Sequence, residues 1–242
     1  MKCLVRAMLL SFVSVIATGN IEAQAGTVSI FDGDMNTDDY ELLTPSSSPG
    51  QASFSQFPIG GNPGTFMRVN HSGSAVSVFD NTSLLTLVLN VAQPHDPASG
   101  AIESLSYSED SLGISRSGVN TSVGRVAIRQ DGFLFFSEPT FTPADSATAF
   151  GSNTLNNLVA SDFQAFINGT TIPTANPDFS SSGGILEFGW LLSRTGRGRV
   201  FVDDTLGFDN FRIDLETSNI PEPCSLLLIL LSTSSLSMWR RR

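Results

Sequence analysis

The stretch that decides the fold class is Ser122-Val-Gly-Arg-Val-Ala-Ile-Arg-Gln130, followed by Asp131-Gly132 and then Phe133-Leu-Phe-Phe136. Both runs are rich in β-branched and aromatic residues, which is typical of β-strands. An Asp-Gly pair between two such runs is a strong signal for a two-residue hairpin turn, because both turn positions need a positive φ angle. The sequence therefore predicts an antiparallel hairpin at this point.

Similar short runs recur along the chain, separated by clusters of Gly, Pro, Asn, Asp and Ser. Candidate strands cover residues 27–31, 52–57, 65–70, 75–79, 85–91, 101–107, 122–130, 132–136, 163–166, 186–192, 199–201 and 207–215. The best helical candidate is the short, polar segment 154–166. Many short strands at this spacing predict an all-β fold, an antiparallel β-sandwich of two packed sheets.

The first 25 residues have the layout of a secretory signal. Lys2 and Arg6 precede an apolar stretch over residues 8–17, and the small residues Ala23 and Ala25 stand where a signal peptidase reads. The alternative is an N-terminal anchor helix, but the apolar run is shorter than the roughly 20 residues that span a bilayer. We expect signal peptidase to cut after Ala25.

The other end combines three features in a fixed order: Pro221-Glu222-Pro223, an apolar run beginning at Leu226, and Arg240-Arg241-Arg242. The apolar part predicts a hydrophobic helix that enters a membrane, with the arginines on the cytoplasmic side. This end resembles the PEP-CTERM sorting signal of bacterial proteins. The resemblance implies recognition by an exosortase-type enzyme, transient membrane anchoring, and delivery to the cell surface or extracellular matrix. An ordinary C-terminal tail anchor is the alternative.

These ends divide the chain into a signal peptide at 1–25, a β-sandwich domain at 26–219 and a sorting signal at 220–242. Cys3 and Cys224 both lie in the ends, so the body has no disulfide. Lys2 is the only lysine, and the body has eight arginines against twenty-one acidic residues, a net charge of about −13. Such a surface repels nucleic acid, whose binding needs dense Lys and Arg contacts.

A second resemblance covers the body. It depends on 60–64 (Gly-Gly-Asn-Pro-Gly), 100–110, 177–180, 185–190 and Gly207-Phe-Asp-Asn-Phe211, which stand in this order. This series is similar to PEP-CTERM proteins with a lectin-like or laminin-type jelly roll. The resemblance implies a jelly-roll topology in which the last strand pairs beside the first.

The loop after the first predicted strand is a candidate calcium site. Asp32, Asp34, Asn36 and Asp38 alternate along it, and calcium takes six to eight oxygen ligands. In a jelly roll this loop can meet Asp209 or the Asp203-Asp204 pair near the last strand. The alternative is a solvated acidic turn.

Aromatic residues give a candidate sugar-binding face. Tyr40, Tyr107, Trp190 and surface phenylalanines can stack on sugar rings, although Trp190 lies in an apolar run that favours a place in the core. The cluster 194–199, with three arginines, either holds an acidic polysaccharide or offsets nearby acids.

Catalysis has little support. Glu103, followed by Glu109 and Asp110, gives the only candidate carboxylates for glycoside hydrolysis, and strand alternation places Glu103 on the face of Tyr107. The two histidines have no matching cysteines for zinc. The sequence therefore predicts a non-enzymatic surface or matrix protein that binds carbohydrate or adheres. A structural matrix component without a specific ligand and a secreted glycoside hydrolase are the alternatives.

Overall fold

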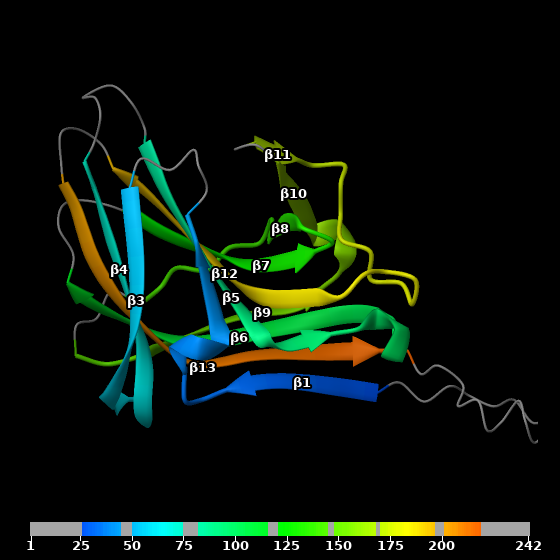
Figure 1. Cartoon of the computed structure of the whole chain (residues 1–242), viewed down its shortest axis with the longest axis horizontal. Helices are drawn as coiled ribbons and strands as arrows, with labels where there is room; N and C mark the ends of the chain where they lie inside the picture. The colour runs from blue at the N-terminus through cyan, green and yellow to red at the C-terminus, as the bar shows by residue number, and fades with distance from the viewer. Residues whose placement is uncertain are drawn as a thin grey trace, which may run out of the picture. The chain divides into compact units, whose positions relative to one another are not determined.

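The computed structural model of the chain describes residues 26–44, 50–74, 82–115, 121–144, 148–167, 170–196 and 201–218 (Figure 1). Within them, Gly26–Ser218 forms one compact unit. Several expected features lie outside the described residues: Ala23 and Ala25, Pro221-Glu222-Pro223, Arg240–Arg242, the N-terminal signal helix and C-terminal hydrophobic helix that the sequence predicts, and the expected strand at 75–79. None of the described residues belongs to a helix long and apolar enough to cross a membrane.

The described chain is built from strands and three short 3-10 helices. The strands are β1 (Gly26–Asp32), β2 (Tyr40–Leu43), β3 (Gly50–Gly61), β4 (Gly64–Ser74), β5 (Thr82–His95), β6 (Ile102–Ser115), β7 (Thr121–Gln130), β8 (Phe133–Ser137), β9 (Gly151–Leu158), β10 (Phe163–Ile167), β11 (Thr170–Ile172), β12 (Leu186–Gly196) and β13 (Phe201–Thr217). The 3-10 helices are η1 (Thr37–Asp39), η2 (Pro97–Ser99) and η3 (Ala160–Asp162).

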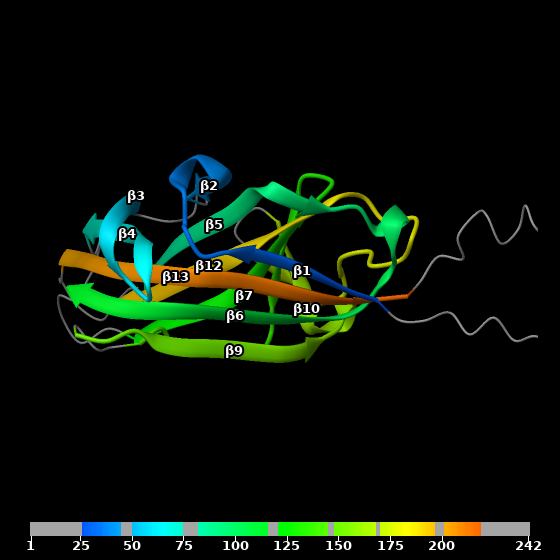
Figure 2. The same cartoon turned by 90° about the horizontal axis from the view of Figure 1, so that it is seen from below.

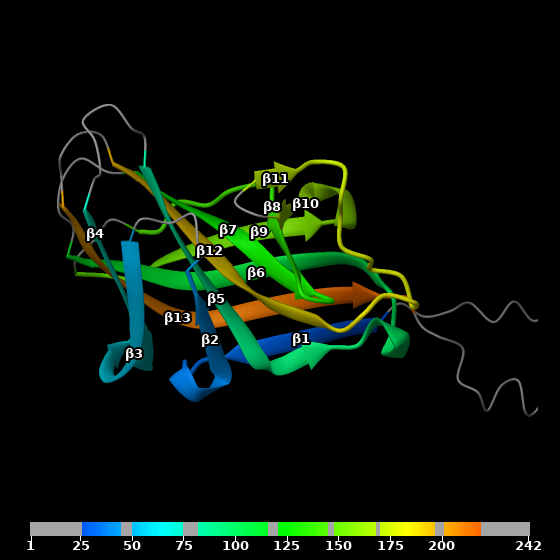
Figure 3. The same cartoon turned by 45° about the horizontal axis from the view of Figure 1, so that its top comes forward.

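Two antiparallel sheets form a sandwich, so the predicted all-β class is confirmed. One sheet has the order β3-β4-β13-β6-β9, with β1 also paired to β13, and Figure 2 shows β1, β13, β6 and β9 side by side. The other has the order β11-β10-β8-β7-β12-β5-β2, and Figure 3 shows β7, β12, β5 and β2 in succession. We call them the six-stranded and the seven-stranded sheet.

The first and last strands are neighbours, as expected from the body's resemblance. β1 pairs with the second half of β13, from Gly26 opposite Thr217 to Asp32 opposite Phe211. Figure 1 accordingly shows the start of β1 and the end of β13 at the same end of the body. The first half of β13 pairs with β4, so one long strand organises this sheet.

The predicted hairpin is confirmed. β7 and β8 pair from Ala127 opposite Phe136 to Gln130 opposite Phe133. The turn residues Asp131 and Gly132 have φ angles of 52° and 81°. Two consecutive positive φ angles twist the turn in the same sense as the strands, which is why this residue pair suits a two-residue hairpin.

The helical interpretation of 154–166 is wrong. The segment contains most of β9, then η3, then the start of β10. Ser152, Thr154 and Asn156 are exposed while the residues between them are partly buried, a period of two rather than of a helix. Asn157, with a φ angle of 56°, ends the regular alternation.

The core between the sheets is aromatic. Trp190 is fully buried, with ring centroids 5.8 Å from Tyr40, 5.2 Å from Phe208 and 5.5 Å from Phe211. Burial of each such side chain contributes about 2–3 kcal/mol. The core position of Trp190 that the sequence favoured is therefore confirmed.

The seven-stranded sheet carries a second apolar layer on its outer face. It consists of the buried residues Leu87, Leu89, Ala127, Phe136 and Leu191, which form a cluster separate from the main core. Partly buried side chains pack against it: Leu43, Leu85, Val91, Leu134 and Phe166. This face is therefore apolar over the strands that lead to the pocket described next.

Candidate functional site

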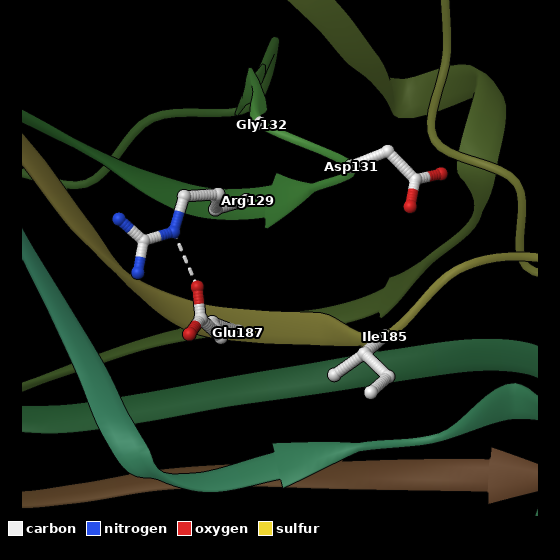
Figure 4. A pocket seen from close by; sticks show the side chains of 5 residues that line it. All are labelled: Arg129, Asp131, Gly132, Ile185 and Glu187. Carbon is white, nitrogen blue, oxygen red and sulfur yellow. Dashed lines mark hydrogen bonds and ion pairs between the residues drawn. The ribbon is translucent and has the colours of Figure 1, made fainter.

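An open pocket of about 420 Å³ lies at one end of β7 and β12. Arg129, Asp131, Gly132, Ile185 and Glu187 line it, as Figure 4 shows. Arg129 and Glu187 alternate with core residues on their strands, so they lie on the outer face of the seven-stranded sheet, like the second apolar layer. The pocket thus joins a charged group to an apolar surface.

Sheet register places the charged residues of the pocket. Arg129 and Glu187 are direct partners in the pairing of β7 with β12. The Arg129 guanidinium donates from Nε to Glu187 and from Nη1 to Glu41 of β2, the latter at 2.6 Å. The hydrogen bond to Glu187, followed by the one to Glu41, raises the pKa of Arg129 further above its usual range.

Gln130 fixes the rim of the pocket. Its side chain is buried, and its Nε2 donates to the carbonyl oxygens of Asp178 (2.7 Å) and Gly184 (2.9 Å). Its Oε1 accepts from the backbone N–H of Asp178 at 2.7 Å. These bonds hold the 178–185 loop beside the β7–β8 turn and leave Ile185 with 58% of its surface exposed.

The arrangement offers donors, acceptors and an apolar contact within one open site. Arg129 supplies N–H donors in a fixed plane, and the carboxylates supply acceptors. Because Arg129 is bonded to two glutamates, it is oriented before any ligand arrives. Arg129 is surrounded by three carboxylates, those of Glu41, Glu187 and Asp131. The site therefore has an excess of negative charge, which disfavours an anionic ligand.

The sequence did not single out this group. Arg129 and Glu187 are far apart in the chain and meet only through the pairing of β7 with β12. A weak signal was present, because Arg125, Ala127 and Arg129 alternate with apolar residues beside a predictable turn. The partner strand could not be identified from the sequence.

The predicted aromatic sugar-binding face is wrong for its three named members. Tyr40, Tyr107 and Trp190 are all buried between the sheets. Strand alternation points each of them inward, and burial raises the pKa of both tyrosines far above the usual value. The phenylalanines that expose about half of their surface are Phe31 (49%) and Phe133 (52%) among the described residues.

The candidate calcium loop forms a turn held by its own side chains. Asp32 Oδ1 accepts the backbone N–H groups of Asp34 (2.9 Å) and Met35 (2.8 Å). Asn36 caps η1 by accepting from the N–H of Asp38. No group of three or more His, Cys, Asp or Glu side chains that could hold a metal ion occurs in the described part of the chain. The calcium hypothesis stays a prediction.

Asp209 belongs to a hydrogen-bonded network instead. It accepts from the backbone N–H groups of Asn62 and Asn210, while Asp110, its partner across the strands, accepts from the side-chain amides of the same two residues. Burial raises the pKa of Asp209, and the nearby charges of Asp110 and Asp32 add to this effect. Asp32 and Asp209 are therefore close enough to interact, as expected for the loop.

The carboxylates of β6 have different surroundings from those expected. Glu103 is exposed, and the register of β6 against β13 shifts between Ile102 and Ser104, so Glu103 does not share the face of Tyr107. Glu109 is buried on the core side, with Oε1 accepting from Asn153 at 3.3 Å. Burial raises the pKa of Glu109 to about 8. The placement of Glu103 on the face of Tyr107 is therefore wrong.

The two histidines do not share a site. His95 is buried, and its Nε2 lies 3.1 Å from the carbonyl oxygen of Gly100 beside η2. His71 is buried in β4, opposite Asp204 of β13. The structure describes the backbone of residues 194–196 of the arginine-rich segment, at the end of β12. Residues 197–200 lie outside the described residues.

No protein-family model matches the sequence, and no curated protein sequence matches it either. Among solved structures, the family 11 carbohydrate-binding module of Clostridium thermocellum, in complex with a β-1,3-1,4-mixed-linked tetrasaccharide, is similar at 13% identity and a TM-score of 0.45. The match covers 82% of this chain and 100% of the module.

Two further structures show the range of the matches. The module CBM27-1 of Caldicellulosiruptor saccharolyticus, in complex with mannohexaose, has 12% identity and a TM-score of 0.41, covering 77% of this chain and 96% of that one. An exo-β-agarase has 16% identity and a TM-score of 0.39, covering 81% of this chain and 25% of that one. Binding modules and an enzyme both occur among these matches.

Proposed function

We propose that the chain is an exported surface or matrix protein whose β-sandwich body binds a neutral polysaccharide at the Arg129 pocket. The observation that supports this most is the guanidinium of Arg129, held between Glu187 and Glu41 at an open site. Polar groups with fixed directions beside an apolar surface suit a ligand that has both hydroxyl groups and apolar C–H faces.

The charge of the site and of the body selects the class of polysaccharide. The pocket has more carboxylates than cations, and the body as a whole has a net charge of about −13. A uronic-acid or sulfated polymer would be repelled by both, whereas a neutral glycan would not. On the same face the apolar cluster around Leu89 is buried, and partly buried side chains such as Leu134 and Phe166 pack against it.

Export is proposed from the two ends of the chain. The signal-like segment ending at Ala25 and the Pro221-Glu222-Pro223 tail support passage through signal peptidase and an exosortase-type enzyme. In this proposal the tail contacts the membrane only until it is processed, and the body is delivered to the surface or matrix. A body without lysine or cysteine, rich in Ser, Thr, Asn and Gly, suits that location.

The binding proposal is tested with the purified chain on an array of neutral and acidic polysaccharides. We expect Arg129→Ala to weaken binding of a neutral polymer by about tenfold or more, as for the loss of one or two hydrogen bonds from a charged donor. Arg212→Ala is the matched control, because Arg212 is also ion-paired, to Asp214, but lies on the other sheet. Equal losses for both variants, or no glycan bound by the parent chain, would contradict the proposal.

A further inference from the structure

Strand β9 is a long, uncharged edge of the six-stranded sheet. It pairs with β6 on one side and with no described strand on the other. Its eight residues, Gly-Ser-Asn-Thr-Leu-Asn-Asn-Leu, include no charged residue and no proline. Ser152, Thr154 and Asn156 are exposed along it. An edge strand of this kind leaves backbone N–H and C=O groups free to pair with another strand.

The other described edges have features that hinder pairing. β11 has three residues, and β2 has four, including the charged Glu41. β3 contains Pro58, and its Gln56 donates to the carbonyl oxygen of Asp34 in the neighbouring loop. On β1, the carbonyl oxygen of Phe31 accepts from Gln93 of β5 at 3.3 Å. Proteins protect sheet edges with short strands, charges, prolines and covering groups. β9 has no charge and no proline, and among the described residues Ala144 lies closely against its first residue, Gly151.

The inner side of β9 is firmly attached, so the free edge is presented in a fixed position. Asn153 Nδ2 donates to Ser111 Oγ at 2.8 Å and to Glu109 Oε1 at 3.3 Å, both on β6. Five further residue pairs join the two strands, from Leu105 opposite Leu158 to Ser111 opposite Gly151. A rigid edge loses little conformational freedom when a second strand pairs with it.

The strand itself carries no charge that opposes contact between copies at this edge. The body has a net charge of about −13, so two copies repel one another over most of their surface. On the outer face, β9 adjoins the uncharged Ser106 and Ser108 of β6, and Ser152 Oγ donates to Asp110, whose side chain is buried. Two copies of β9 can meet antiparallel about a two-fold axis without bringing described acidic side chains of either strand together, because the strand has none.

We propose that β9 pairs with β9 of a second copy of this chain, joining two six-stranded sheets into one continuous sheet. Such a contact is isologous, since the same strand serves both copies. One pair of eight-residue strands buries less than the roughly 1,000 Å² expected of a stable interface. The dimer is therefore weak and forms where the protein is concentrated, as on a surface or in a matrix.

The test is sedimentation velocity on the purified full chain over a wide concentration range. We expect a concentration-dependent monomer–dimer equilibrium. Thr154→Lys places a charge near the middle of β9 in both copies, and the repulsion should raise the dissociation constant by about tenfold or more. Thr171→Lys is the matched control, because it makes the same substitution at an exposed residue of the β11 edge. We expect this variant to associate like the parent.

Two results would overturn the proposal: a parent chain that stays monomeric at millimolar concentration, or equal association of the two lysine variants. If Thr154→Lys does not fold, amide hydrogen exchange on the parent replaces it. Exchange at 151–156 should then slow with protein concentration, while exchange in β11 should not, and an unchanged rate in β9 would refute the pairing. No glycan is present in either measurement, so the outcome is separate from that of the Arg129 pocket.

Discussion

Replacing Glu109 by glutamine should stabilise the protein at neutral and alkaline pH. Glu109 lies on the core side of β6 with 2% of its surface exposed. Its Oε1 accepts from Asn153, whereas Oε2 has no hydrogen-bond partner among the described residues. An ionised carboxylate in this place loses its hydration without gaining a cation in return. Glutamine has the same shape, keeps the acceptor for Asn153 and never becomes charged.

The magnitude follows from proton linkage. Burial raises the pKa of Glu109 from its ordinary value of 4.5 to about 8 in the folded protein. Between these two values the folded state binds more protons than the unfolded state, so stability falls as the pH rises. The loss is absent below pH 4.5 and complete above pH 8. At 1.36 kcal/mol per unit the loss of stability amounts to about 5 kcal/mol.

The assay is urea unfolding of the parent and Glu109→Gln from acidic to mildly alkaline pH. We expect similar free energies of unfolding near pH 4.5 and a difference of several kcal/mol in favour of the variant above pH 8, because only the parent titrates Glu109. Other shifted groups, such as Asp209 and Asp214, are present in both proteins and cancel in the difference. Glu103→Gln, at an exposed glutamate of the same strand, is the control. Parallel curves for the parent and Glu109→Gln would refute the reasoning.

Three further predictions concern the turn, the acidic loop and the ends. Gly132→Val should cost about 1–2 kcal/mol in urea unfolding through its positive φ angle alone, because nothing lies within 4 Å of an added Cβ; an unchanged stability would contradict this. Millimolar calcium should raise the melting temperature if the 32–38 loop binds it, and an unchanged melting temperature would make the loop a solvated acidic turn. Intact mass on the protein from its host should fit a chain from Gly26 to about Pro221, and a retained tail would indicate a membrane anchor.

The fold class was predictable because the strongest signals were local. The Asp131-Gly132 turn determines its own φ angles, and the flanking runs have the composition of strands. The same holds for Trp190, whose apolar neighbours on β12 already favour burial. Such features depend on residues adjacent in sequence, and the structure confirms them.

Features that depend on register were not predictable. Glu103 was placed on the face of Tyr107 by simple alternation, but the shift at Ile102 and Ser104 changes the phase of β6 before Leu105. The Arg129–Glu187–Glu41 group needs the order β7-β12-β5-β2, which joins strands from three regions of the chain. A shift of one residue in a strand moves every side chain to the other face, so a site made across a sheet cannot be derived without its register.

The weak apolar pattern of β9 explains both why the sequence did not predict this strand and why the strand can pair with another copy. A central strand of a sandwich has apolar residues at every second position, because one of its faces is buried in the core. An edge strand buries less of that face and therefore has fewer apolar residues. In β9 the inward positions include Asn153 and Leu155, and the outward positions are Ser152, Thr154 and Asn156, so the apolar alternation is almost lost. Asn153 takes an inward place because Glu109 and Ser111 give it partners there. The sequence of β9 has little apolar alternation and no charge. It therefore contains no feature that would prevent a second strand from pairing with its free edge.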